Sequence, residues 1–218
     1  MNCRYCQGKC VKNGKQANGI QRYLCEHCGK SQQANYQYAA CELKTRDLFL
    51  RCLKIGSSLR GVQYVTGVAV STQLRWIKAL SKSVKPPAKI RLYDEYEVDE
   101  LCTYVGHKGR RRWVISAISR STRQVIDVQV GTRSMKNLSL VVKKLLRLSP
   151  TAIYTDKLNI YASLIPKEIH KVKARGINKI ERYHLNLRTH LKRLNRRTIC
   201  YSKSELVLSY LVKIYNWA

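Results

Sequence analysis

The chain has 218 residues, of which 42 are lysine or arginine and only 13 are aspartate or glutamate, giving a formal net charge of +29 at pH 7. Its hydrophobic content of 44% excludes a wholly disordered protein, and no apolar run reaches the twenty or so residues that a membrane span needs. The start, MNCRYC, has no apolar signal core, so we expect a cytoplasmic protein without a membrane partner. A chain with this much positive charge favours nucleic acid as its partner, because each phosphate that it neutralises releases a counterion and thereby strengthens binding.

Two Cys-x-x-Cys pairs lie near the start of the chain, Cys3 with Cys6 and Cys25 with Cys28. The 18 residues between the pairs fall within the spacing of a four-thiolate zinc site. Cys10 is close enough in sequence to replace Cys6, so that choice stays open. A redox or chance arrangement is less favoured, because no βαβ pattern surrounds either pair. We therefore predict a zinc ribbon over residues 1–41 that holds one structural Zn²⁺.

Residues 42–85 have the pattern of three short helices, at 45–54, 59–64 and 72–82. The third helix has an apolar stripe made of Leu74, Ile77 and Leu80. Its polar face carries Thr72, Arg75 and Lys78. This layout predicts a helix-turn-helix unit whose third helix contacts DNA through the polar face, although a plain three-helix packing unit is the alternative. The prolines that follow break regular structure, so we place a linker at 86–91.

From residue 92 to residue 218 the pattern changes to that of a mixed α/β domain. Three successive strands are predicted at 96–105, 112–119 and 124–130. They are followed by a helix at 137–148, a strand at 152–155, a short helix, a strand at 169–173 and helices at 178–194 and 203–216. Because consecutive strands precede alternating helices and strands, we expect one mixed sheet with helices packed on it.

Acidic residues are scarce, so those at the ends of predicted elements invite explanation. Asp99 lies in the first of these strands, Asp156 just after the strand at 152–155, and Glu181 near the start of a basic helix. Neighbouring residues of a strand point to opposite faces, so we expect only one of Asp99 and Glu100 to line a given site; whether Glu100 is a ligand stays open. Singly, each acid could be a strand-edge charge, a helix cap or an acid favoured by the helix dipole. Together they suit a site for two Mg²⁺ ions, for which Mn²⁺ can substitute.

Several stretches resemble the transposase of the bacterial insertion sequence one family. The resemblance is carried by YEVDEL around Asp99, by YTD ending at Asp156, and by IERYHLNLRTHLKRL, which contains Glu181. It covers essentially the whole chain and implies a ribonuclease H-like catalytic domain in which these three residues form an Asp-Asp-Glu triad. Two positions depart from the family pattern, since Lys157 stands where glycine is expected and His184 where asparagine is expected.

The resemblance implies a DNA transposase that binds the terminal inverted repeats of its own element, cuts to free 3′ ends and joins them to target DNA. DNA-binding residues implied on the C-terminal basic helix are Arg182, Asn186, Arg188, His190 and Lys192. Because both ends of the element must be held at once, we expect a homodimer or larger assembly on double-stranded DNA. The alternatives are a DNA-binding regulator without catalysis, a ribonuclease H-like nuclease or resolvase, and a recombinase that uses Tyr183 or Tyr201 as nucleophile.

Overall fold

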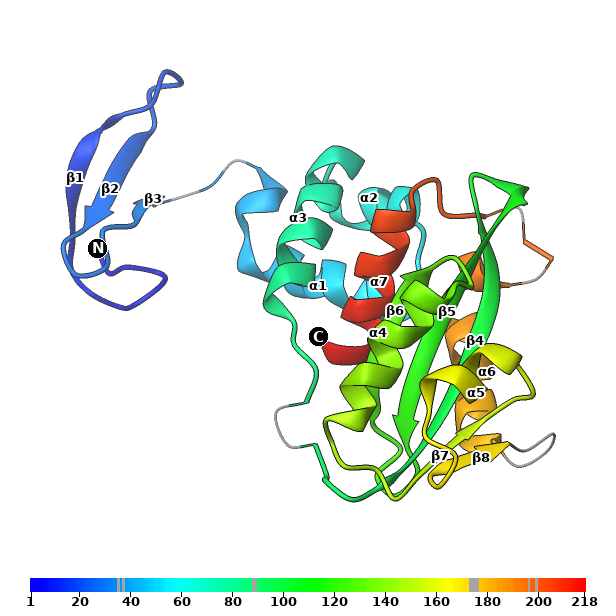
Figure 1. Ribbon diagram of the computed structural model, residues 1–218. Coiled ribbons are helices and arrows are strands. Elements are labelled where there is room, and N and C mark those ends of the chain that lie inside the picture. Colours follow the sequence, from blue (N-terminus) through cyan, green and yellow to red (C-terminus); the bar gives the residue numbers. More distant parts are fainter. Residues whose placement is uncertain (35, 37, 88–89, 173–176, 196, 199) are drawn as a thin grey trace.

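The computed structural model describes residues 1–34, 36, 38–87, 90–172, 177–195, 197–198 and 200–218. The chain forms a small N-terminal sheet, a three-helix unit and a larger mixed sheet with helices on both faces (Figure 1). The predicted mixed α/β class is therefore confirmed. Residues 88–89 of the predicted linker and residue 173 of the predicted strand lie outside the described residues. None of the helices in the described part of the chain is both long and apolar enough to cross a bilayer.

The N-terminal sheet contains three short antiparallel strands, β1 (Cys10–Lys15), β2 (Gln21–Cys25) and β3 (Ser31–Gln33). It stands away from the rest of the molecule (Figure 1). Its buried side chains are cysteines and Gln32 rather than a set of large apolar residues. So small a sheet cannot stabilise itself by apolar burial alone, and a metal or disulfide is the usual supplement.

The three-helix unit consists of α1 (Leu43–Lys54), α2 (Leu59–Thr66) and α3 (Val70–Ser83), preceded by a 3₁₀ turn at Ala39–Cys41. All three predicted helices are confirmed. The predicted apolar stripe of α3 is wrong at Leu74, which is 37% exposed, whereas Gln73 is buried. The amide group of Gln73 donates to the carbonyls of Leu59 and Val68, at 3.0 and 2.8 Å, and these two hydrogen bonds allow its side-chain NH₂ to be buried.

The large sheet has the strand order β6-β5-β4-β7-β8. Its strands are β4 (Glu95–Val105), β5 (His107–Ser119), β6 (Val125–Gly131), β7 (Ala152–Thr155) and β8 (His170–Val172). The first three form an antiparallel meander, and β7 and β8 run parallel to β4. β5 begins earlier than predicted, because Gly106, with a φ of 80°, turns the chain at once into the next strand.

Helices cover both faces of this sheet. One face packs on α4 (Met135–Leu146) and α5 (Asn159–Leu164) through a core that includes Tyr96, Val98 and Ile153. The other face packs on α6 (Asn178–His190), the 3₁₀ turn Lys192–Leu194 and α7 (Glu205–Trp217) through a core that includes Leu101 and Val105. Even-numbered residues of β4 thus face α4 and α5, and odd-numbered residues face α6 and α7.

Helix α7 belongs to two hydrophobic cores at once. Leu208 and Val212 on one side pack against the large sheet, while Leu211 and Ile214 on the other side pack among the buried residues of α1, α2 and α3. Figure 1 shows α7 in red between the three-helix unit and the green strands. The two parts also meet at Gly56, where an added Cβ would lie 1.5 Å from the carbonyl oxygen of His190. The three-helix unit is therefore fixed to the large sheet through α7 and this close backbone contact.

We expect Leu208→Ala and Leu211→Ala each to lower the free energy of unfolding by about 2–5 kcal/mol, the usual cost of a large cavity in a core. Because one helix closes both cores, either variant should reduce amide hydrogen-exchange protection in the three-helix unit and in the sheet together. Leu206→Ala, at a position 58% exposed on the same helix, serves as the control and should change stability by less than about 0.5 kcal/mol. Loss of protection on one side only would show that α7 does not couple the two cores.

Candidate functional sites

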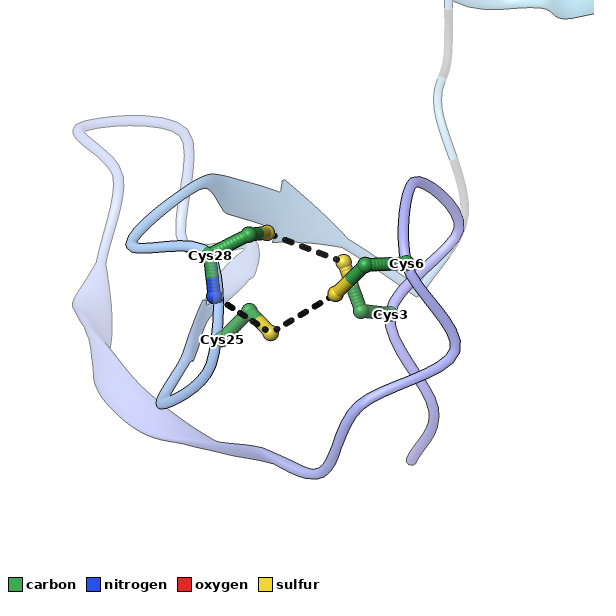
Figure 2. Close-up of side chains that lie close together, drawn as sticks. All are labelled: Cys3, Cys6, Cys25 and Cys28. Atoms are coloured by element: carbon green, nitrogen blue, oxygen red, sulfur yellow. Dashed lines mark hydrogen bonds between the residues drawn. The ribbon is translucent and has the colours of Figure 1, made fainter.

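Four cysteines of the N-terminal sheet point at one centre (Figure 2). Cys3 and Cys6 come from the first turn, Cys25 from the end of β2, and Cys28 from the turn that follows. The sulfur atoms of Cys3 and Cys28 are 3.6 Å apart, and those of Cys6 and Cys25 are 3.5 Å apart. These separations exceed a disulfide bond of about 2.05 Å but suit tetrahedral thiolates that share one ion at about 2.3 Å. The four sulfurs could therefore hold a metal ion.

Burial and hydrogen bonds shift the pKa values of these thiols in different directions, lowering that of Cys3 and raising those of Cys6 and the neighbouring Cys10. Burial raises the pKa of Cys3, but hydrogen bonds from the backbone amides of Tyr5 and Cys6 and from the Cys28 thiol outweigh burial and lower it to about 6. Burial and the nearby Cys25 and Cys3 raise the pKa of Cys10 to about 11. Cys10 lies outside the group of four, and its sulfur accepts a hydrogen bond from Gln32 Nε2 at 3.5 Å. The geometry thus selects Cys6 rather than Cys10 as the fourth member.

Asp99 and Asp156 lie close together where the ladder between the neighbouring strands β4 and β7 ends. The parallel ladder between β4 and β7 pairs Glu97 with Tyr154, and two residues further along each strand come the two aspartates. Asp156 lies just beyond β7, where its Oδ1 accepts from the Leu158 amide at 3.0 Å. This is the carboxyl end of β7 and of its parallel ladder with β4, a place where open α/β sheets commonly bind ligands. The predicted proximity of the two aspartates is therefore confirmed.

Glu100 joins them, which corrects the expectation that only one of Asp99 and Glu100 could line a site. Asp99, Glu100 and Asp156 each offer an oxygen, and these oxygens all lie within 4.8 Å of one another. The ladder to β7 has ended at this level, so side chains from both faces of β4 can reach round the strand edge. The Asp99 carboxylate also folds back along the strand, since its Oδ1 accepts from the Glu100 amide at 2.8 Å.

The Glu100 carboxylate is enclosed by Arg133 and Tyr161, and its side chain is only 1% exposed. Arg133 Nη2 lies 2.8 Å from Glu100 Oε2 and 3.4 Å from Asp156 Oδ2, and the hydroxyl of Tyr161 donates to Glu100 Oε1. Burial raises the pKa of Glu100, while Tyr161 and Arg133 act in the opposite direction. Nothing in the sequence marked either partner, because both lie in loops or helices remote from the acidic run.

Glu181 stands apart from this cluster. It lies in the first turn of α6 and is exposed, and the group of mutually close acids found among the described residues does not include it. Helix α6 nevertheless reaches the cluster one turn later, where His184 Nδ1 lies 3.4 Å from Asp99 Oδ2. The role of Glu181 as the third acid stays a prediction.

The start of α6 is tied to β4 by Glu97, which sequence reasoning did not single out. Its side chain is 1% exposed, its Oε2 accepts from the Ile180 amide at 2.9 Å, and its Oε1 lies 3.2 Å from Arg120 Nε. A buried carboxylate at a helix N-terminus is favoured by the unpaired amides and by the helix dipole. The sequence signal was available, since Glu97 is two residues before Asp99 and therefore on the same face of the strand.

The predicted DNA-binding residues lie on two surfaces. On α3, Arg75 and Lys78 are exposed, and Arg75 donates to the Thr72 hydroxyl at 3.0 Å. On α6, Arg182 and Asn186 are exposed and line a cavity of about 470 Å³ together with Arg123 and Lys179. Beyond them lie Arg188, which is half-buried, and two exposed residues, His190 and Lys192. Both surfaces are basic.

Comparison with known proteins identifies relatives over the part of the chain that forms the large sheet and the helices packed on it. The sequence model described as IS1 transposase matches residues 95–215. An insertion element IS1 protein InsB from Escherichia coli (strain K12) is 37% identical over 108 residues, which are 50% of this chain and 65% of that protein. An IS1 InsB protein from Shigella flexneri is 36% identical over 108 residues, which are 50% of this chain and 82% of that protein.

Among solved structures, a simian T-cell lymphotropic virus intasome in complex with the PP2A regulatory subunit B56 gamma aligns with 71% of this chain and 59% of its own chain. The sequence identity is 10% and the TM-score is 0.35, so the assignment to a family rests on the sequence relatives alone.

Proposed function

This chain belongs to the IS1 transposase family, and we propose that it is a DNA transposase that cuts and joins strands by a metal-dependent mechanism. The supporting observation is the approach of the Asp99 and Asp156 carboxylates where the parallel ladder between β4 and β7 ends. The matched segment spans just under two thirds of the E. coli relative, so the activity of the whole protein is part of the proposal.

The proposal assigns a task to each part of the chain. Residues 1–41 act as a zinc ribbon, residues 42–85 as a helix-turn-helix unit completed by α7, and residues 92–218 as a ribonuclease H-like catalytic domain, with the linker at 86–91. The strand order supports the last assignment, because an antiparallel meander followed by parallel strands brings Asp99 and Asp156 to one edge. Double-stranded DNA, as element ends and as target, is the proposed partner, bound by a homodimer or larger assembly.

The acids of the large sheet fit divalent cations. Carboxylate oxygens are the ligands that Mg²⁺ and Mn²⁺ prefer, and three of them are close enough to share a site. When bound, two such cations supply activation of the attacking oxygen and stabilisation of the leaving oxygen. We assign Asp99, Asp156 and Glu181 as the ligands, on the strength of the family triad. Glu100 is the competing third acid, because it already lies beside the aspartates.

The surrounding residues orient these ligands and bind the substrate. The Leu158 amide fixes one oxygen of Asp156, and the Glu100 amide fixes one oxygen of Asp99. His184 contacts the other oxygen of Asp99 and thereby links α6 to the acids. The basic side chains of α3 and α6 are the proposed contacts to the DNA.

The recombinase alternative is not favoured by the surroundings of Tyr183. Its ring packs between the sheet and α6, and burial raises the pKa of its hydroxyl, which opposes formation of a tyrosinate nucleophile. A regulator without catalysis would not require three acids so close together, since their charges repel one another. A nuclease or resolvase would use the same acids and differ in its preference for branched DNA.

Strand cleavage and joining on labelled element-end DNA test the proposed function. We expect 3′ ends to be freed and joined to target DNA in Mg²⁺ or Mn²⁺, and no reaction without either cation. Specific binding of the end DNA without cleavage in either metal would favour the regulator. Preferential cutting of four-way junctions over linear ends would favour a resolvase, and a protein–DNA adduct through tyrosine would revive the recombinase.

A further inference from the structure

Arg133 places a permanent positive charge inside the acidic cluster. It lies in the loop between β6 and α4 and contacts two of the three acids. An arginine remains charged at any pH the protein meets, so it offsets part of the repulsion between Glu100 and Asp156. The Arg133 guanidinium therefore competes with a divalent cation for the oxygens of this cluster.

The loop that carries Arg133 is held on both sides. Asn137 Nδ2 donates to the Thr132 carbonyl at 2.8 Å, and Ser134 caps α4 by accepting from the Asn137 amide. Gly131 approaches Asn137 so closely that an added Cβ would lie 2.5 Å from Nδ2. The guanidinium is thus presented by an anchored backbone, not by a loop free to move away.

The two ion pairs of Arg133 are unequal. Toward Glu100, both Nε at 3.0 Å and Nη2 at 2.8 Å engage the same oxygen, and the acceptor side chain is 1% exposed. Toward Asp156, a single Nη2 lies at 3.4 Å, and the acceptor side chain is 36% exposed. Buried, charge-assisted hydrogen bonds are stronger than solvent-exposed ones. Arg133 can therefore release Asp156 while it keeps Glu100.

We propose that Arg133 is the internal counter-ion of the site, which holds Asp156 in the metal-free protein and which a divalent cation must displace from that residue. Arg133 thereby sets how tightly the site binds the cation, and Glu100 retains the guanidinium during the exchange. Asp156 is a proposed ligand of the catalytic cation, so this inference rests on the proposed function. Arg133 is a positioning residue, since it acts through Asp156 and Glu100.

Titration of Mn²⁺ into the full-length protein without DNA, followed by electron paramagnetic resonance of the free ion, tests this directly. We expect Arg133→Gln to bind Mn²⁺ on the order of tenfold more tightly than the unmodified protein, because a competing charge beside the ligands is removed. Arg133→Lys keeps the charge and should stay within about threefold of the unmodified protein. Arg51→Gln removes one charge from an exposed pair on α1 and should leave the affinity unchanged.

Equal or weaker Mn²⁺ binding by a folded Arg133→Gln variant, judged by an unchanged circular dichroism spectrum, would overturn the counter-ion role. Tighter binding by Arg51→Gln to the same extent would overturn it as well, because net charge alone would then explain the effect. If the unmodified protein cleaves element ends in Mn²⁺ while Arg133→Gln shows unaltered affinity, the inference fails and the proposed function stands. Absence of Mn²⁺ binding in every variant would overturn both.

Discussion

Asp99→Asn and Asp156→Asn should each reduce strand cleavage in Mg²⁺ by roughly a thousandfold or more. Loss of a carboxylate ligand removes several kcal/mol of transition-state stabilisation, and about 1.4 kcal/mol corresponds to a factor of ten. Binding of end DNA without added Mg²⁺ should be retained, since neither aspartate belongs to the basic surfaces. Thermal stability should be unchanged or higher, because each variant removes one of three mutually repelling charges. Single-turnover cleavage of labelled DNA and thermal melts measure the two effects.

The comparison of Glu181→Gln with Glu100→Gln identifies the third acid. If the family triad applies, Glu181→Gln should resemble the aspartate variants, although this residue is exposed and outside the close group. Glu100→Gln should then retain more activity, because its carboxylate is occupied by Arg133 and Tyr161. The reverse order would make Glu100 the ligand. Full activity of either aspartate variant would refute the two-metal site itself.

Removal of zinc should unfold the N-terminal sheet and leave the remainder of the molecule intact. Structural zinc in small domains contributes an apparent 10–16 kcal/mol to folding, and this sheet has no apolar core to compensate. Cys25→Ser, or chelation, should therefore abolish hydrogen-exchange protection over β1, β2 and β3, while protection of β4 and β5 persists. Protons compete with zinc for the four thiolates, so acidification should release the ion, whereas the site should stay loaded at neutral pH.

Cys10→Ser provides the matched control for the zinc prediction. Its sulfur is buried nearby but lies outside the group of four, so one zinc ion per chain should remain bound. Zinc content measured by a colorimetric chelator distinguishes the cases. Retention of zinc by Cys6→Ser together with its loss from Cys10→Ser would assign Cys10 as the fourth ligand in place of Cys6.

The parts of the fold with strong periodicity were predictable. The strand at β4 and the helix at α6 follow regular apolar patterns, and Ile180, Leu187 and Leu191 are buried as their spacing indicates. The close approach of Asp99 and Asp156 was implied by the family resemblance, which places both residues in one triad. The cluster of four cysteines was also predictable, because the two residues between the cysteines of each pair let both sulfurs point at one centre.

The rest depends on tertiary contacts that no local pattern encodes. Gln73 is buried because two carbonyls from other segments accept its hydrogens, so the polar residue and not Leu74 faces the core. Glu100 joins the cluster because the ladder to β7 stops short, which strand parity alone cannot reveal. Arg133 reaches Glu100 across 33 positions of sequence. Such long-range polar pairs carry no periodic signal.

The double role of α7 affects how the protein matures on the ribosome. This helix is synthesised after every other segment of the two cores it closes, so neither core can reach its final packing while the earlier segments are emerging. A fragment that ends before α7, produced by premature termination or by a protease, would leave both cores open in a single event. Under the proposed function, such a fragment would be expected neither to bind an element end nor to cut it.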